Sequence, residues 1–310
     1  MTEPPTFSII IPVFNGESTI GRAIDSVIQQ TYKNFELIVV DDGSSDGTEA
    51  IIRGYGSSLK HIHQENAGAA AARNRGVQAA NGRWLVFLDS DDWFYPTRLE
   101  IHARILDEDP DLDFLTGGFD AFQEDGAFIN NSMASTTLGT QLMERANGKS
   151  WVSLKEHELG DFVAHQFSDV RCLTVPRKTF VELDGFPEDF AICEDVHFII
   201  RLCAQSHRVG VACVPLAAYV VHDHGLVRSN VLRAQEQTVA ALIAVRKQLT
   251  SAPQVIMIGL NKVLFRARCD LATVLLRYGQ RHKAFRAVIP LLKDQPGWLS
   301  VRAVLSVLKG

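Results

Sequence analysis

The sequence has few cysteines, and none of them are spaced as a metal site or a disulfide framework requires. There are five cysteines among 310 residues, an odd number, and no two of them form a Cys-x-x-Cys pair. Thiolate zinc sites usually contain such pairs, and disulfide-rich secreted domains usually carry an even number of cysteines. The cysteine pattern argues against both classes and fits a protein kept in a reducing compartment.

Long apolar runs are also absent from the sequence. The run at residues 8–11 is short and has no cationic segment before it, so we expect no signal peptide. The apolar stretches near the C-terminus are interrupted by Asn261, Lys262 and Arg266, and none approaches the roughly 20 apolar residues that span a bilayer. We therefore expect a cytoplasmic protein whose contact with a membrane, if it has one, is peripheral and on the inner face.

The chain has no strong excess of charge of either sign, but its two ends differ. It contains 31 Lys and Arg against 36 Asp and Glu, a net charge of −5. Residues 231–310 hold 13 basic and 3 acidic residues, whereas residues 1–230 hold 18 basic and 33 acidic residues. With 46% hydrophobic and 22% charged residues, the composition excludes a disordered or fibrous chain. The opposite charges of the two ends indicate different partners for them.

The first third of the sequence alternates apolar runs with helical periods, the pattern of repeated β-α-β units. Residues 7–11 and 36–40 are apolar runs of the kind found in strands covered on both faces. Between them, four apolar residues recur with helical spacing in residues 20–28. The sequence therefore predicts an α/β fold, a Rossmann-like, mostly parallel sheet between helices. Further strands are predicted at 59–63, 83–88 and 114–115, and further helices at 69–80 and 96–106.

The rest of the sequence is less regular. Residues 119–150 are rich in Asn, Ser, Thr, Gly and Gln, so we expect a loop-rich crossing there. A helix is predicted around residues 196–203, and two closing strands at 211–214 and 218–221. From residue 231 the chain is predicted to be helical to its end, with interruptions at three prolines: Pro253, Pro290 and Pro296.

Acidic residues follow two of the strongest predicted strands. In an open parallel sheet the ligand site lies beyond the carboxyl ends of the strands. One interpretation is that these residues only cap helices and shape turns. The other is a shared site, since clustered carboxylates repel one another unless a cation such as Mg²⁺ or Mn²⁺ lies between them. The carboxylates concerned are Asp41, Asp42, Asp89, Asp91 and Asp92.

A series of motifs in unbroken order resembles glycosyltransferase family 2. The motifs are FSIIIPVFN at 7–15, ELIVVDDGSSD at 36–46, NAG at 66–68, ARNRG at 72–76, LDSDD at 88–92, GF at 185–186, ED at 194–195 and RL at 201–202. The resemblance covers residues 6–230 and implies a GT-A fold that binds a nucleotide-sugar and transfers the sugar with inversion. It also implies a division into a nucleotide-sugar-binding half at 1–118, an acceptor-binding half at 119–230 and a basic helical region at 231–310.

The resemblance implies a role for each matching residue. Pro12 and Phe14 line the nucleotide base pocket, and Asp42 accepts a hydrogen bond from the base. Asp89 contacts the ribose or the sugar, while Asp91 coordinates the Mn²⁺ or Mg²⁺ ion and Asp92 lies behind it. Arg73 either lies near the nucleotide or pairs with the acidic loop. The full set expected to bind the nucleotide-sugar is Pro12, Phe14, Asn15, Asp42, Arg73, Asp89, Ser90 and Arg228.

The resemblance also places a general base in the second half of the chain. Asp195 matches the position of the base that takes the proton of the acceptor hydroxyl, and Glu194 is the alternative. Independently, the predicted helix puts Asp195 at a helix N-terminus, where the helix dipole favours a charged carboxylate, and a plain N-terminal charge is the competing interpretation. His222 resembles a histidine that reaches the metal or the diphosphate, and His224 competes with it for that role. Arg228 falls in a segment that closes over the donor.

The basic C-terminal region admits two interpretations. Its cations can form a solvated face of helices packed on the catalytic domain, or they can meet an anionic membrane surface or a lipid-linked acceptor. It lacks the aromatic residues and motifs of a nucleic-acid-binding surface, so no nucleic acid is expected.

The sequence predicts a metal-assisted inverting glycosyltransferase that uses a UDP-sugar and a glycan or lipid-linked acceptor to build a bacterial surface glycan. Two alternatives remain: a catalytically inactive nucleotide-sugar-binding subunit and another nucleotide-sugar enzyme such as a pyrophosphorylase. A dehydrogenase is disfavoured because no G-x-G-x-x-G follows the first strand.

Overall fold

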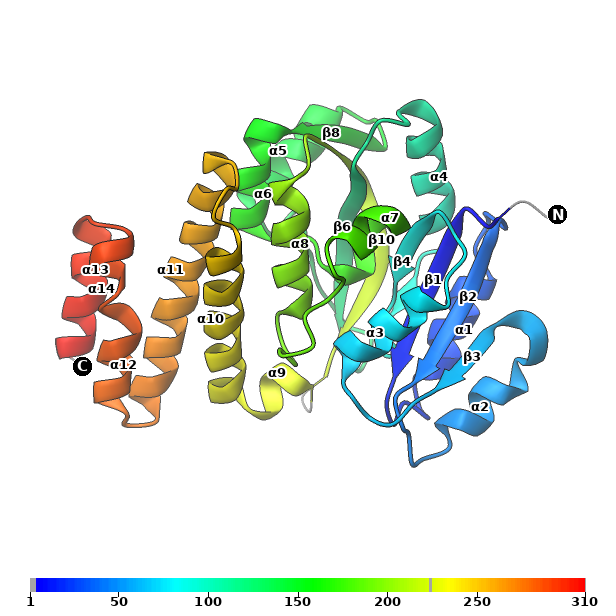
Figure 1. Ribbon diagram of the computed structural model, residues 1–310, viewed down its shortest axis with the longest axis horizontal. Coiled ribbons are helices and arrows are strands. Elements are labelled where there is room, and N and C mark those ends of the chain that lie inside the picture. Colours follow the sequence, from blue (N-terminus) through cyan, green and yellow to red (C-terminus); the bar gives the residue numbers. More distant parts are fainter. Residues whose placement is uncertain (1–3, 223–224, 310) are drawn as a thin grey trace. The chain divides into compact units, whose positions relative to one another are not determined.

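The structure is a computed structural model that describes residues 4–222 and 225–309 (Figure 1). The chain divides into two compact units, each described here on its own. The sheet unit comprises the described residues of Met1–Glu156, Gln166–Ala191 and Ser206–Val221. The helical unit comprises His157–His165, Ile192–Gln205 and the described part of His222–Gly310. Three short 3-10 helices accompany the main elements: η1 (Gly56–Ser58), η2 (Glu156–Glu158) and η3 (Val170–Cys172).

The sheet unit is built on a ten-stranded mixed sheet with the order β3-β2-β1-β4-β9-β6-β10-β5. Strands β3, β2, β1 and β4 run parallel to one another, as the sequence predicts, while β9 lies antiparallel between β4 and β6. Strand β7 pairs with β6, and β8 pairs with β10. The strands are β1 (Phe7–Val13), β2 (Phe35–Asp41), β3 (Lys60–His63), β4 (Trp84–Phe87), β5 (Trp93–Phe94), β6 (Phe114–Gln123), β7 (Phe128–Asn131), β8 (Trp151–Lys155), β9 (Thr174–Pro176) and β10 (Arg208–Val221).

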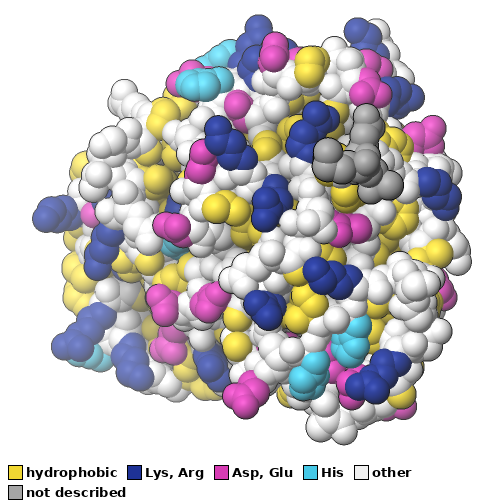
Figure 2. Space-filling model, turned by 45° about the vertical axis from the view of Figure 1, so that its right-hand side comes forward, with side chains coloured by type: hydrophobic (Ala, Val, Ile, Leu, Met, Phe, Trp, Pro, Cys, Tyr) yellow, Lys and Arg dark blue, Asp and Glu magenta, His cyan; other side chains and the backbone are white. Residues whose placement is uncertain are grey.

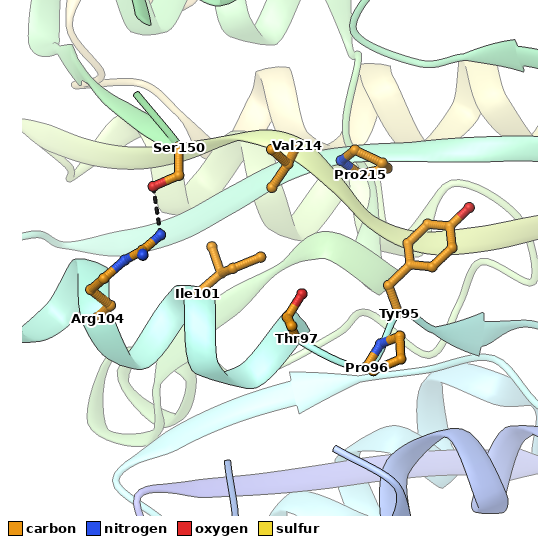
Figure 3. A pocket seen from close by; sticks show the side chains of 8 residues that line it. All are labelled: Tyr95, Pro96, Thr97, Ile101, Arg104, Ser150, Val214 and Pro215. Carbon is orange, nitrogen blue, oxygen red and sulfur yellow. Dashed lines mark hydrogen bonds between the residues drawn. The ribbon is translucent and has the colours of Figure 1, made fainter. Parts of the chain in front are cut away.

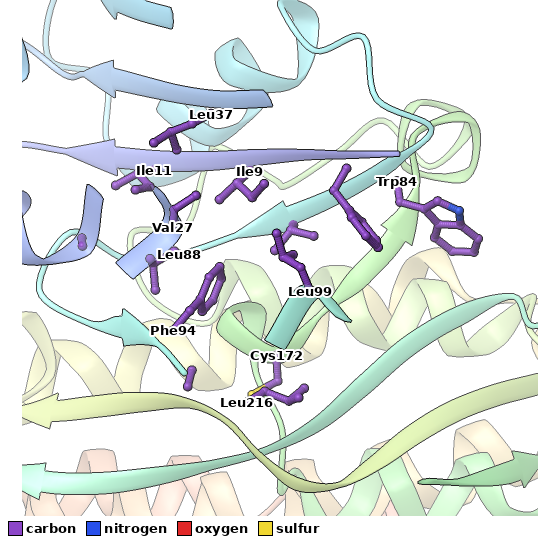
Figure 4. Packing of buried hydrophobic residues seen from close by; sticks show 14 of the residues in the cluster. Ile9, Ile11, Val27, Leu37, Trp84, Leu88, Phe94, Leu99, Cys172 and Leu216 are labelled. Carbon is purple, nitrogen blue, oxygen red and sulfur yellow. The ribbon is translucent and has the colours of Figure 1, made fainter. Parts of the chain in front are cut away.

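Helices cover both faces of the parallel half of the sheet. On one face, Ile9 and Ile11 of β1 pack in a core with Val27 of the first helix and Leu99 of the fourth (Figure 4). On the other face, Gly76 lies so close to Ile10 that a Cβ there would stand 2.5 Å from its Cγ2. Each fully buried aliphatic side chain contributes roughly 1.5–3 kcal/mol, so this two-sided burial explains why the strand is apolar throughout. The helices are α1 (Ile20–Ile28), α2 (Thr48–Gly54), α3 (Ala69–Gln78), α4 (Arg98–Glu108), α5 (Thr137–Ala146) and α7 (Arg177–Glu182).

Two expectations for the second half of the sheet unit are wrong. The segment expected to be a loop-rich crossing contains the end of β6, strand β7 and helix α5. Leu138, Leu142 and Ala146 supply a buried helical face, and Thr136 caps the helix by accepting a hydrogen bond from the Gly139 N–H. The two expected closing strands are one strand, β10, whose register with β6 shifts on either side of Pro215. A β-bulge accommodates the proline without ending the strand.

The helical unit confirms the prediction of helices from residue 231 onward and of a helix around residues 196–203. Pro253 and Pro290 stand at the N-caps of α11 and α13, as the punctuation by prolines predicts. Among the described residues, no helix combines the length and apolar character needed to cross a bilayer. The helices are α6 (Leu159–His165), α8 (Glu194–Ala204), α9 (Leu226–Ser229), α10 (Val231–Gln248), α11 (Gln254–Arg277), α12 (Arg281–Val288), α13 (Leu291–Asp294) and α14 (Trp298–Lys309).

Helix α11 packs tightly on α6 through a pair of glycines. A Cβ on Gly259 would stand 2.1 Å from the carbonyl oxygen of Gly160, so only glycine permits this approach. Lys262 Nζ of the same helix lies 3.1 Å from Asp161 Oδ1, and the guanidinium of Arg266 donates to the carbonyl oxygen of Ala164. These two cations of the basic region therefore serve contacts inside the unit.

Candidate active site

The carboxyl ends of β1, β2 and β4 meet at one edge of the sheet. The strands are parallel and in register, with Val13 of β1 opposite Asp41 of β2 and Ile10 of β1 opposite Phe87 of β4. The loops that follow these strands carry most of the residues that the sequence predicts for the site. The parallel topology therefore brings three separate motifs of the sequence together, as the position of ligand sites in such sheets predicts.

The acidic pair at the end of β2 is held mainly by hydrogen bonds from backbone N–H groups. Asp42 is buried, and its carboxylate accepts hydrogen bonds from Gln64 Nε2 at 2.7 Å, the Ala67 N–H at 2.9 Å and the Gly68 N–H at 2.8 Å. Asp41 accepts from the Ser44 N–H at 2.9 Å and lies 3.1 Å from His63 Nδ1. Burial alone raises the pKa of Asp41, but these hydrogen bonds outweigh it and hold the pKa below its usual value. Both carboxylates thus shape the loops around them.

The loop after β1 is tied to the loop after β2. Asn15 adopts a left-handed conformation with φ of 49°, its N–H donates to Ser44 Oγ at 2.9 Å, and its Oδ1 accepts from the Ser45 N–H at 2.8 Å. The ring of Phe14 is 52% exposed beside this joint, whereas Pro12 is buried within β1. Of the two residues expected to line the base pocket, Phe14 alone presents its side chain to solvent.

The acidic segment after β4 is held by arginines. Arg73 of α3, which is only 4% exposed, donates to Asp89 Oδ1 at 2.5 Å. The Nε of Arg171, in η3, lies 3.0 Å from Asp92 Oδ2, and the Val220 N–H donates to Asp92 Oδ1 at 3.0 Å. The structure therefore favours, for Arg73, the ion pair with the acidic loop that the sequence offered as one of two interpretations.

Arg171 is the site residue that the sequence analysis missed. Its guanidinium also lies 3.7 Å from Asp89 and 3.0 Å from Asp169, and it stands 4.1 Å from the ring centroid of Tyr219 and 4.8 Å from that of Phe119. Three carboxylates and two aromatic faces therefore share one buried cation. No motif surrounds Arg171, so no signal in the sequence alone assigns it to the site.

The pKa values of the segment follow from this arrangement. Burial raises the pKa of Asp89, but Arg73 and Arg171 more than compensate and hold it below its usual value. Burial raises the pKa of Asp92 well above its usual value, and the carboxylates of Asp91 and Asp89 add to this against the opposing effect of Arg171. Burial lowers the pKa of Arg171, but the carboxylates of Asp169, Asp92 and Asp89 outweigh this and raise its pKa above the usual value, so the guanidinium stays charged.

Asp91 differs from its two neighbours in the motif. Its side chain is half-buried, and its backbone carbonyl accepts from the Arg22 guanidinium at 2.5 Å. Within the described ranges, no three His, Cys, Asp or Glu side chains are grouped closely enough to cage a metal ion. Mg²⁺ and Mn²⁺ nevertheless bind nucleotides through one or two carboxylates, with phosphate oxygens and water completing the shell. The donors here are oxygens of the right kind, so the segment fits such an ion.

Two other sequence motifs have structural partners in the sheet unit. The side chain of Asn74 in α3 accepts from the Phe186 N–H at 3.0 Å and donates to the Phe186 carbonyl at 2.9 Å. Gly185 has a φ of 61°, which places it in the left-handed region that favours glycine. Ser90 is half-buried next to Asp91. The Gly-Phe motif therefore holds the segment before the second unit against α3.

The remaining predicted residues lie in the helical unit. Glu194 and Asp195 form the first turn of α8, where Glu194 is buried and Asp195 is half-buried, with the Val196 N–H donating to Asp195 Oδ1 at 2.7 Å. His222 follows directly after β10, and Arg228 is exposed on α9. His224, the competitor of His222, lies outside the described residues.

The sheet unit also contains a hollow of about 490 Å³ (Figure 3). It lies between the start of α4 and the bulged part of β10, and Arg104 donates to Ser150 Oγ across it at 2.7 Å. None of the residues predicted for the site lines it. The lining residues are Tyr95, Pro96, Thr97, Ile101, Arg104, Ser150, Val214 and Pro215.

Comparison with known proteins identifies the family. The chain belongs to glycosyl transferase family 2, because the model of that family matches residues 8–165, about half of the chain. It is 35% identical to an uncharacterized glycosyltransferase of Rickettsia bellii over 194 residues, which are 62% of this chain and 26% of that protein. The chain spans between 20% and 34% of the length of the five rickettsial relatives that it matches.

Two solved structures share the fold. S. aureus TarS in complex with UDP-GlcNAc is similar with a TM-score of 0.69 at 19% identity, covering 97% of this chain and 89% of that one. The mannosyltransferase PcManGT from Pyrobaculum calidifontis, in complex with GDP-Man and Mn²⁺, has a TM-score of 0.61 at 18% identity, covering 99% and 81%. These likenesses confirm the GT-A type α/β fold that the sequence predicts.

Proposed function

We propose that this chain is a metal-assisted, inverting glycosyltransferase that moves a sugar from a nucleotide diphosphate to a hydroxyl group of a glycan or lipid-linked acceptor. The observation that carries the proposal is the acidic segment at the end of β4. Arg73 and Arg171 bind its outer carboxylates, Asp89 and Asp92, while Asp91 stands between them at the edge where ligands of parallel sheets bind. Membership of the family supports the same activity.

In this proposal Asp91 holds the divalent cation together with the diphosphate of the donor. The ion would supply positive charge to the diphosphate as it leaves. Asp89 stays ionised because its arginines lower its pKa, so it can accept a hydrogen bond from a ribose or sugar hydroxyl. Asp92 keeps the loop in place through Arg171 and the backbone of β10.

The reaction balances with residues of this chain. The acceptor oxygen forms a bond to the anomeric carbon, the bond from that carbon to the phosphate oxygen breaks, and the nucleoside diphosphate leaves with the electron pair. The proton of the acceptor hydroxyl passes to the carboxylate of Asp195, with Glu194 as the alternative base. Attack opposite the leaving group inverts the anomeric centre. Asp195 is favoured because Glu194 is more deeply buried.

The donor side is proposed from the edge of the sheet. The exposed ring of Phe14 offers a stacking surface for the nucleotide base, and Asn15 and Ser90 offer polar atoms beside it. Arg228 and His222 are proposed to contact the diphosphate, since guanidinium and imidazole groups donate hydrogen bonds to phosphate. We propose UDP as the nucleotide, supported by the UDP-GlcNAc complex of a protein with this fold, and a bacterial surface glycan as the product.

Calorimetric titration with UDP and GDP, each with and without Mn²⁺ or Mg²⁺, tests the donor half of the proposal. We expect UDP to bind more tightly than GDP and to bind more tightly with the ion than without it. Slow hydrolysis of a UDP-sugar to UDP and free sugar would then show that the bound donor is activated. Tight binding without any hydrolysis or transfer would support the inactive binding subunit, and release of a sugar phosphate with a nucleoside triphosphate would support a pyrophosphorylase.

A further inference from the structure

The chain from Tyr278 onward exposes an unusual share of apolar side chains, most of them on α13 and α14. Of the fourteen large hydrophobic side chains that are exposed among the described residues, eight lie between Tyr278 and Leu308. Trp298 is 72% exposed and Leu299 is 66% exposed. Exposed apolar side chains scattered singly are ordinary, but a concentration of them in about a tenth of the chain marks an interaction surface.

Helix α14 places four of these side chains on one stripe. Trp298, Val301, Leu305 and Leu308 follow one another at intervals of three or four residues, which puts them on the same side of a helix. The opposite side is already used, since Ser300, Val304 and Val307 are buried. The helix is therefore apolar on its inner side, where it packs, and also on its outer side, where the four side chains of the stripe are exposed.

The charges around this stripe are almost all positive. Residues 281–310 contain six Lys and Arg and one acidic residue, Asp294, which lies 2.8 Å from Arg246 in an ion pair. Arg302 is exposed on α14, four residues after Trp298 and three before Leu305, so it flanks the stripe. Lys283, Arg286 and Lys293 are exposed on α12 and α13. On the face drawn in Figure 2, by contrast, basic and acidic side chains lie intermixed.

Other cations of the basic C-terminal region serve the unit itself. Besides Lys262 and Arg266, the guanidinium of Arg268 donates to the Ala287 carbonyl at 2.9 Å, and that of Arg281 donates to the Leu308 carbonyl at the end of α14. Arg233, Lys247 and Arg277 on α10 and α11 are exposed as well, so exposed cations are not confined to α12, α13 and α14. The surface is therefore defined by the exposed apolar side chains of α13 and α14, together with the exposed cations of α12, α13 and α14.

We propose that this surface, formed by the outer stripe of α14 and the exposed cations of α12–α14, docks on an anionic lipid bilayer. The apolar side chains enter the interface between headgroups and acyl chains while the cations contact lipid phosphates. Tryptophan at one end of the stripe suits this position, since its ring is amphipathic. A second copy of the chain is a poorer occupant, because two surfaces of the same positive sign would repel. The proposal does not depend on the proposed function.

Sedimentation with vesicles tests the proposal. We expect the chain to bind vesicles that contain phosphatidylglycerol, to bind pure phosphatidylcholine vesicles at least about ten-fold more weakly, and to lose binding at high salt. The double variant Trp298→Ser, Leu305→Ser should weaken binding at least about ten-fold, given the apolar area removed. Arg302→Gln should weaken it about five-fold, the equivalent of about 1 kcal/mol per cation at such a surface. All three residues are exposed, so these changes leave the packed side of α14 intact.

Matched controls separate this surface from general apolar or structural effects. Ile258→Ser changes a side chain that is 48% exposed on α11 of the same unit and should bind as the unchanged chain does. The Trp298 emission should shift to shorter wavelength on binding, and Trp298→Phe should lose that shift while keeping most of the affinity. Equal binding by the double variant and the control, or equal binding to neutral and anionic vesicles, would overturn the proposal. A dimer that the double variant dissociates, seen by sedimentation velocity, would overturn it in favour of a second copy.

Discussion

The two acidic segments at the edge of the sheet are held in different ways. After β2, Asp41 and Asp42 accept hydrogen bonds from backbone N–H groups, an amide and an imidazole. After β4, Asp89 and Asp92 pair with the guanidinium groups of Arg73 and Arg171. The two strands flank the same central strand, β1, but β2 also pairs with the parallel β3 and β4 with the antiparallel β9. Arg171 comes from η3, directly before β9, so the neighbour of β4 supplies one of the charged partners.

Backbone N–H groups and arginine side chains have different effects on the carboxylates that they contact. Backbone N–H groups that donate to a carboxylate fix the shape of a loop, as those of Ala67 and Gly68 do around Asp42, and they carry no net charge. Arginines neutralise carboxylates that would otherwise repel one another, so three of them can stand within four residues. In the proposed function, the segment after β4 is therefore the one that meets the ligand, while the segment after β2 shapes the loops beside it.

The comparison extends to a third acidic pair, Glu194 and Asp195. We expect substitutions there to have the largest effect on activity. Asp195→Asn should lower kcat roughly 10²–10⁴-fold, because the variant cannot take the proton of the acceptor. The affinity for the nucleoside diphosphate should stay within a few-fold, since the residue acts on the acceptor. Steady-state transfer assays and calorimetry on the same preparation check both. A larger loss of kcat in Glu194→Gln than in Asp195→Asn would assign the role of the base to Glu194. The matched control is Asp270→Asn, on the exposed side of α11, which should leave kcat unchanged.

The second largest effect is expected on stability, when the shared cation, Arg171, is removed. Arg171→Ala leaves Asp89, Asp92 and Asp169 without their common partner, and breaking a buried ion pair costs about 3–5 kcal/mol in the free energy of unfolding. Adding Asp92→Asn should restore part of that loss, because the most deeply buried charge is then gone. Urea denaturation measures the free energy of unfolding of the unchanged chain, of Arg171→Ala and of the double variant. Arg53→Ala, which removes an exposed pair with Glu49, should change stability by less than about 1 kcal/mol. Equal losses at both arginines would contradict the comparison.

A smaller and more specific effect is expected on metal dependence. Asp91→Ala should make the affinity for UDP independent of Mn²⁺, a loss of about a hundred-fold in the enhancement by the ion if Asp91 is its protein ligand. Asp42→Asn should lower the affinity in the presence and absence of the ion alike, because it loosens the loop and leaves the segment after β4 unchanged. The quantity to compare is the ratio of the dissociation constant for UDP without Mn²⁺ to that with Mn²⁺. An unchanged ratio for Asp91→Ala would remove that residue from the metal site.

The sequence predicted the parallel half of the fold because its signals are local. Continuous apolar runs identify strands that are buried on both faces, and polar residues identify where they end. The helix at Thr137–Ala146 was missed because polar residues surround its short apolar period, and tertiary packing stabilises it more than propensity does. Pro215 suggested an end to the strand, but a bulge in β10 accommodates the proline and the strand continues.

The site was predictable to the same extent. Carboxylates that directly follow strands must lie at the edge of the sheet, so their meeting follows from topology. Arg171 could not be predicted, because it comes from a distant segment that returns to the sheet beside β9 and has no motif of its own. The roles of Asp195, His222 and Arg228, and the division at residues 118 and 230, stay predictions, since they depend on how the two units and the ligands come together.

The smallest expected effect is the dependence of stability on pH, which should have opposite sign at two neighbouring carboxylates. Asp89 has a lowered pKa in the folded state, so its contribution is present above the unfolded value of about 3.9 and is lost as the pH falls through the folded pKa. Asp92 has a raised pKa, so its contribution is present below that unfolded value and is lost as the pH rises through the folded pKa. Urea denaturation between about pH 3 and pH 7 should therefore show the stability difference between the unchanged chain and Asp89→Asn rising with pH, and that for Asp92→Asn falling. If the two stability differences changed with pH in the same direction, Arg171 would neutralise both carboxylates equally. The proposed distinction between Asp89, which faces the ligand, and Asp92, which anchors the loop, would then be lost.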